Sequence, residues 1–185
     1  GKECNKETIQ RNYTLDKKDG EKLFKIIKSF FINKGLVFFG GYANILYNNY
    51  LPKKERILLK KYPDFDVLAL HPEKITEELL KILKNKGFPD VKFKKHKNVG
   101  EIIAPHYEII VNGETLAFVY EPVACHNFNE IVVDNSKIRI ATIDTILSFY
   151  LAFLYSNHAF EDRKYKDRLM CMSKFLFEVE EKDKI

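Results

Sequence analysis

The stretch FFGGYANILYNNY, residues 38–50, decides the fold of this chain. A short apolar run ends at two adjacent glycines, and apolar residues at helical spacing follow through Ile45 and Leu46. We interpret it as a buried strand, a tight turn and a helix. The glycines would let the backbone approach a ligand closely, and the amino end of a helix favours phosphate. The alternative is a plain turn.

Further helices and two hairpins are expected along the chain. The predicted helices lie at residues 19–34, 72–87, 142–157 and 162–184. A strand is expected over residues 64–70. Asn112-Gly113 and Asp134-Asn135 each separate two β-rich runs, which predicts two antiparallel hairpins.

Length, cysteine content and charge limit the class of protein. A chain of 185 residues allows one well-cored domain, or one domain with a helical appendage. No apolar run approaches the ~20 residues that span a bilayer, so we expect a soluble protein with no membrane partner. The three cysteines are odd in number and far apart, which favours a reducing, cytoplasmic location over a disulfide framework. The net charge of +5 fits a polyanionic partner but is also ordinary.

Asp64 and Asp66 are the candidate metal ligands. Alternate side chains of a strand share a face, so both carboxylates should converge on one spot. Such pairs persist where a cation neutralises them, and carboxylate oxygens are natural ligands of Mg²⁺. The alternative is an exposed strand end with two solvated acids. The apolar run through Val67, Leu68 and Leu70 favours a core strand and therefore the metal site.

The glycine pair and the two aspartates together resemble the nucleotidyltransferase superfamily of the polymerase-beta type. Its signature is hG[GS] followed by [DE]h[DE]h, here FFGG and DFDV. Within it, the basic loop after residue 50 and the segments VYEPVACHNFNEI and IATIDTILSFYLAF are similar to poly(A) polymerase catalytic subunits of poxviruses and large DNA viruses. The resemblance covers roughly residues 20–180 and implies an α+β fold, with a mixed, largely antiparallel sheet flanked by helices and followed by C-terminal helices.

The resemblance also implies a domain plan. We expect an N-terminal arm over residues 1–18, a nucleotidyltransferase catalytic domain over 19–140 and a helical extension over 141–185. The last helix has no stop signal, so the extension is expected to be truncated from a longer chain.

The activity that the resemblance implies is polynucleotide adenylyl transfer. Such an enzyme adds AMP from ATP to RNA 3′ ends by a two-metal mechanism, here in viral mRNA processing. Asp64 and Asp66 would hold two Mg²⁺ or Mn²⁺ ions, and Gly40 and Gly41 would bind the β- and γ-phosphates. The implied partners are an RNA 3′ end and ATP, with a second copy of the chain or a processivity subunit as candidate protein partners. The implied location is the host cytoplasm or the virion.

Two positions depart from the superfamily pattern. Tyr42 stands where a Ser or Thr usually contacts the triphosphate. The third carboxylate of the family is expected near Phe118, at the centre of its strand. We select Glu114 for this role because alternation places it on the face of Phe118, with Glu108 and Glu121 as alternatives. If none fills the role, the chain is a degenerate, non-catalytic domain that binds RNA or a partner subunit.

Basic residues before the aspartates are candidates for phosphate contact. They are Lys53, Lys54, Arg56, Lys60 and Lys61. We select Lys60 and Lys61 as nucleotide ligands, with a solvated loop as the alternative. Lysines 92, 94, 95 and 97 form a second run with a weaker claim, and Cys125-His126 is expected to pack rather than bind metal. A different acceptor, such as a tRNA end, a protein or a small antibiotic, remains an alternative to RNA.

Overall fold

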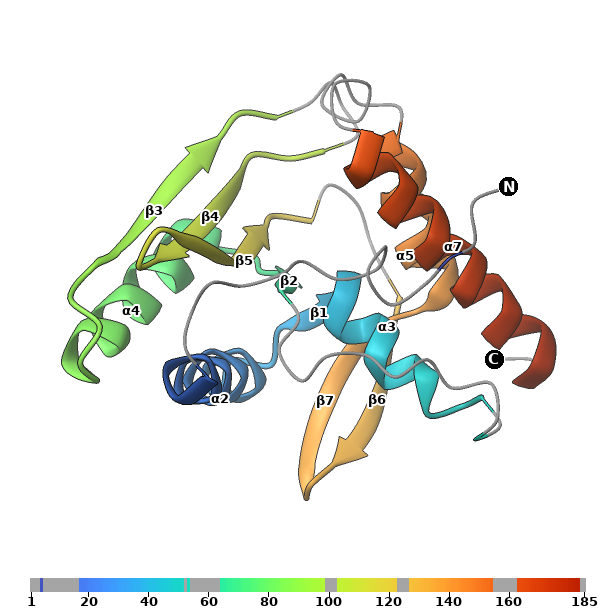
Figure 1. Cartoon of the computed structure of the whole chain (residues 1–185), viewed down its shortest axis with the longest axis horizontal. Helices are drawn as coiled ribbons and strands as arrows, with labels where there is room; N and C mark the ends of the chain where they lie inside the picture. Colours follow the sequence, from blue (N-terminus) through green and yellow to red (C-terminus); the bar gives the residue numbers. More distant parts are fainter. Residues whose placement is uncertain are drawn as a thin grey trace.

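The structure, a computed structural model, describes residue 4 and residues 17–51, 53, 64–98, 103–122, 127–154 and 163–183. At the centre of these residues is a seven-stranded sheet with the order β3-β4-β5-β2-β1-β7-β6 (Figure 1). The strands are β1 (Val37–Phe39), β2 (Phe65–Leu68), β3 (Val91–His96), β4 (His106–Val111), β5 (Glu114–Tyr120), β6 (Phe128–Val133) and β7 (Ser136–Ala141). β1 is parallel to β7 and β2 is parallel to β5, whereas the other neighbours are antiparallel.

Helices cover both faces of the sheet. They are α2 (Lys17–Asn33), α3 (Gly40–Asn48), α4 (Pro72–Asn85), α5 (Ile143–Leu154) and α7 (Arg163–Asp183). On one face, Phe31 of α2 packs against Phe38 of β1, and α4 lies beside α2 through the Lys34–Glu78 ion pair. On the other face, Phe149 of α5 stacks on Phe39 with ring centroids 4.7 Å apart.

This architecture confirms the predicted fold class, a mixed sheet flanked by helices. Both predicted hairpins form, and the residues of their turns have the positive φ that a two-residue hairpin requires: Asn112 51°, Gly113 79°, Asp134 49° and Asn135 64°. β3 was not predicted, because Val91 is its only buried residue and the strand lacks an apolar alternation. One hydrophobic core joins the strands to α5 and α7, and the division at residue 140 stays a prediction.

The expectation that the cysteines stay reduced was wrong for two of the three. Cys4 and Cys171 form a disulfide that joins the N-terminal segment to α7, with Cα atoms 5.4 Å apart. A sequence separation of 167 residues hides such a pairing until the chain is folded. The predicted cytoplasmic location therefore has no support from the cysteines, since disulfides are rare in the cytosol. Among the described residues no helix is long and apolar enough to cross a membrane.

Candidate active site

The glycine pair lies where β1 passes directly into α3. Phe39 occupies the N-cap position in an extended conformation, and no side chain caps the helix. The first backbone N–H groups of a helix have no partner within it, so this end of α3 presents donors to a ligand. Gly40 has a φ of +67°, a left-handed conformation that residues other than glycine adopt at a cost.

Gly40 lies directly against Asp66. A Cβ added at position 40 would lie 2.8 Å from Asp66 Cγ and closer still to Oδ2. Phe39 is the register partner of Asp66, which explains why the next residue meets the aspartate. The absence of a side chain at position 40 is therefore what lets the amino end of α3 approach a carboxylate.

Asp64 and Asp66 provide the hard oxygen donors at this place. Asp64 directly precedes β2 and is half-buried, and its Oδ1 is buried. Because the two aspartates are two residues apart on extended chain, their side chains point to the same side of the sheet. Paired carboxylates beside a helix amino end fit a divalent cation with a bound triphosphate. No third acid, histidine or cysteine joins them to form a larger metal-binding group in the part of the chain described.

Strand register shows what stands beside Asp66. Phe118 of β5 is its direct partner, and Glu108 of β4 is the next residue in the same row. We call the side of the sheet that carries this row the Asp66 face. The phenylalanine thus occupies the position nearest to Asp66 on β5, where the third carboxylate was expected.

The register also corrects the alternation used to choose Glu114. An irregularity between Ile109 and Ile110 makes Thr115 the partner of Ile110 and Glu114 the partner of Val111. Residues opposite each other in an antiparallel pair share a face, so Thr115 joins Glu108 on the Asp66 face and Glu114 does not. A catalytic role for Glu114 stays a prediction from sequence, with this placement against it. Glu121 lies beyond the far end of β5, at the exposed surface.

Glu108 is held by its neighbours on the Asp66 face. His96 Nε2 lies 2.8 Å from Glu108 Oε1, and the Thr115 hydroxyl donates to Oε2. Burial raises the pKa of Glu108, but the hydrogen bonds from Thr115 and His96 outweigh it, and the net pKa is lowered. One of these two bonds therefore runs to the edge strand β3 and the other to β5, and neither involves Asp66.

The side chain of Tyr42 lies in the core. Its ring is 5% exposed and packs against Phe24, Phe38 and Phe65, with centroids 5.0 to 6.1 Å apart. Burial, and secondarily the charge of Asp134, raises the pKa of Tyr42 to about 12. The expected contact between this phenol and a triphosphate therefore has no support in the geometry, and only the Tyr42 backbone remains near the turn.

Asn44 anchors α3, a function that sequence analysis missed. Its Nδ2 donates to Met172 O of α7 at 3.3 Å, and its Oδ1 accepts from the Tyr150 hydroxyl of α5 at 2.7 Å. The side chain is 1% exposed, so both bonds form in the core. The helix that begins at Gly40 is thus fixed to α5 and α7. A polar residue between the apolar Ala43 and Ile45 is the only signal of this in the sequence.

Several predicted contacts lie outside the described residues. Lys60 and Lys61, the predicted nucleotide ligands, are among them, as are Lys54, Arg56, Cys125 and His126. Lys53 is described and is exposed.

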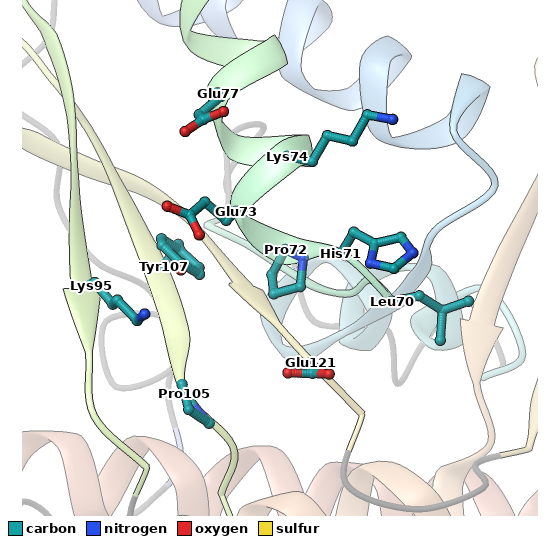
Figure 2. A pocket seen from close by; sticks show the side chains of 10 residues that line it. All are labelled: Leu70, His71, Pro72, Glu73, Lys74, Glu77, Lys95, Pro105, Tyr107 and Glu121. Carbon is teal, nitrogen blue, oxygen red and sulfur yellow. The ribbon is translucent and has the colours of Figure 1, made fainter.

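A pocket of about 540 Å³ lies away from the aspartates, between α4 and strands β3 and β4. Figure 2 shows Glu73 and Glu77 of α4, Tyr107 of β4 and Lys95 of β3 around it. Tyr107 and Lys95 are register partners on the face opposite to Asp66. The pocket is therefore distinct from the candidate active site.

Comparison with known proteins gives the class of fold. No protein-family model and no curated protein matches the chain. Solved structures do match it, and the shared architecture is the nucleotidyltransferase fold.

The Megavirus polyadenylate synthase is one of the similar structures, with a TM-score of 0.62 and 22% identity over 85% of this chain. The chain spans 31% of the length of that protein. The antibiotic-resistance factor ANT(2″)-Ia has a TM-score of 0.52 and 11% identity, over 89% of this chain and 90% of its own. These likenesses confirm the predicted resemblance at the level of the fold.

Proposed function

We propose that the chain is the nucleotidyltransferase part of a template-independent polynucleotide adenylyltransferase, which adds AMP from ATP to an RNA 3′ end. The observation that carries the proposal is the contact between Gly40 and Asp66. It brings the amino end of α3, which favours phosphate, against a pair of carboxylates that favour a divalent cation. The fold shared with the Megavirus polyadenylate synthase supports RNA as the acceptor.

In the proposed reaction, the 3′ oxygen of the acceptor bonds to the α-phosphorus of ATP. The bond between that phosphorus and the β-phosphate oxygen breaks, pyrophosphate leaves, and the hydroxyl proton passes to solvent. Bound Mg²⁺ or Mn²⁺ would stabilise the charge on the attacking and leaving oxygens.

The chain itself contributes position and charge to this reaction. The first amides of α3 would hold the β- and γ-phosphates, and Gly40 and Gly41 keep that surface clear of side chains. Asp64 and Asp66 would hold the cations, and Asn44 keeps α3 in place through α5 and α7. Phosphoryl transfer depends mostly on such positioning.

Primer extension tests the proposal. The chain is incubated with labelled RNA, ATP and Mg²⁺ or Mn²⁺, as wild type and as Asp64→Asn and Asp66→Asn. We expect each variant to lose at least roughly 100-fold in rate, because even partners that only orient metal ligands cost 10–100-fold. Asp90→Asn is the matched control, since Asp90 is exposed and lies before the edge strand β3. Binding of Mn²⁺, measured by calorimetry, should weaken in the first two variants alone.

Continued extension by Asp66→Asn would refute the assignment of this site. Competition with a small antibiotic acceptor belongs in the same assay, because the fold is also that of an antibiotic-resistance factor.

The second candidate function is a non-catalytic RNA-binding module. Phe118 favours it, since this residue stands beside Asp66 where the superfamily has a carboxylate. This function predicts RNA binding by the wild type with no incorporation of nucleotide, and no change of binding in Asp64→Asn.

A further inference from the structure

A line of contacting rings, two pairs of them stacked, crosses the Asp66 face from α5 to the edge of the sheet. Phe153 of α5 contacts Tyr120, with ring centroids 5.8 Å apart. Tyr120 stacks on His106 at 4.5 Å, and His106 stacks on His96 at 5.0 Å with only 12° between their planes. Strand pairing produces this order, because Tyr120, His106 and His96 are partners across β5, β4 and β3. We call these four residues the ring stack.

The outer end of the ring stack is open. β3 is the last strand of the sheet, and within the described residues no strand pairs with its outer edge (Figure 1). The side chain of His96 is 29% exposed, whereas Tyr120 at the inner end is buried beside α5. The last ring therefore presents a face against which another flat ring can stack.

The orientation of His96 is set before any ligand arrives. Its Nε2 bonds to Glu108, and Glu108 is in turn held by Thr115. A ring whose rotamer is already fixed loses little conformational entropy on binding. Neither the stacking nor this bond is needed to close a core, because His96 and Glu108 are only half-buried.

Exposed lysines accompany the open ring. Lys92 and Lys94 alternate with Phe93 and therefore lie on the same side of β3 as His96. Lysines on an edge strand also discourage pairing with other chains, which accounts for the charge but not for the stacked imidazoles. Flat rings beside a basic track are the arrangement with which proteins bind single-stranded nucleic acid.

We infer that the exposed face of His96 binds a base of single-stranded RNA, with Lys92 and Lys94 along the phosphates. This site rests on the proposed function, since it takes the acceptor strand to be RNA. The strand of His96 lies three strands from that of Asp66, so the two residues are at least roughly 14 Å apart at ordinary strand spacing. The base is therefore upstream of the 3′ end. Stacking does not depend on base identity, so the site grips the strand without reading its sequence.

Binding of labelled single-stranded RNA, measured by fluorescence anisotropy without ATP or divalent metal, tests the site. His96→Ala should weaken binding at least about fivefold, the lower limit for loss of one stacked base. His96→Phe should bind nearly as well as the wild type, because it keeps a flat ring. His71→Ala is the matched control, since His71 is exposed at the start of α4. Circular dichroism checks that each variant is folded.

Unchanged binding in His96→Ala overturns the inference, and so does a wild type that does not bind RNA. If His96→Phe binds as weakly as His96→Ala, the imidazole acts through its charge or hydrogen bond, and stacking is refuted. If the wild type extends the primer but His96→Ala binds RNA unchanged, this site alone is refuted. If RNA binding depends on His96 but the wild type does not extend the primer, the proposed function alone is refuted.

Salt dependence tests the lysines separately. Each phosphate contact contributes about 0.7 to the slope of log K against log salt for a single strand. Lys94→Ala should therefore lower that slope by about 0.7. Lys84→Ala on α4 is the control and should leave it unchanged. Equal slopes in Lys94→Ala and the wild type would show that Lys94 of β3 does not contact the RNA phosphates.

Discussion

Replacing Gly40 with alanine is the most direct test of the candidate active site. A φ of +67° costs an L-residue roughly 1–2 kcal/mol. The new methyl group would overlap the Asp66 carboxylate, and overpacking of this kind costs roughly 1–3 kcal/mol. Alanine also makes the unfolded chain less flexible than glycine does, which raises the unfolding free energy by roughly 0.4–1 kcal/mol. We expect a net loss of about 3 kcal/mol in unfolding free energy, or a melting temperature lower by about 6–12 °C for a chain of this size.

Two other glycines separate these contributions. Gly113→Ala meets the same backbone strain at φ +79°, but nothing lies within 4 Å of its added Cβ. It should cost about 1 kcal/mol. Gly20→Ala lies in α2 with neither a positive φ nor a neighbour within 4 Å, and it should gain roughly 0.5–1 kcal/mol. The difference in unfolding free energy between Gly40→Ala and Gly113→Ala therefore measures the cost of the contact with Asp66.

Urea unfolding followed by circular dichroism gives the three stabilities, and primer extension gives the activities. Gly40→Ala should lose activity because Asp66 must move to admit the methyl group, whereas Gly113→Ala and Gly20→Ala should keep it. Equal stability losses for Gly40→Ala and Gly113→Ala, with activity retained in both, would show that the contact does not organise the site.

Three further predictions concern stability. Reduction of the Cys4–Cys171 bond, or Cys4→Ser, should cost roughly 2–5 kcal/mol in urea unfolding, and thiol labelling of the denatured chain at two more cysteines after reduction than before would confirm the bond. Burial, followed by the charge of Asp134, raises the pKa of Tyr42 to about 12, so the folded state keeps a proton that the unfolded chain loses near 10.0. Stability should therefore fall as pH rises between these values, and Tyr42→Phe should flatten this fall in pH-dependent melting. Asn44→Ala should cost about 2 kcal/mol, because it breaks two buried bonds that hold α3, and an unchanged melting temperature would contradict that role.

Much of the fold could be predicted because its signals are local. The Asn112-Gly113 and Asp134-Asn135 turns need positive φ, and residues that tolerate it mark the hairpins directly. The helices follow from apolar spacing, and α4 begins at Pro72 as expected. β3 could not be predicted, since an edge strand with a single buried residue has no apolar period.

The candidate site was predictable in part. The glycine turn and the aspartates were identified from sequence, and the structure brings Gly40 against Asp66. The choice of Glu114 depended on unbroken alternation, which the irregularity at Ile109 and Ile110 interrupts. The irregularity depends on how the two strands of one hairpin pair, which apolar alternation does not record. The disulfide joins residues 167 positions apart, and no local pattern marks such a pairing.

The place of β1 in the sheet has a consequence for the order of assembly. β1 carries the glycine turn, and its two neighbours are β2 and β7, with Val37 opposite Arg139. A nascent chain that has left the ribosome only as far as β5 lacks one of the two flanks of this strand. The strand that carries the glycine turn therefore gains its second neighbour only late in translation, after the second hairpin has emerged and β7 has paired with β1.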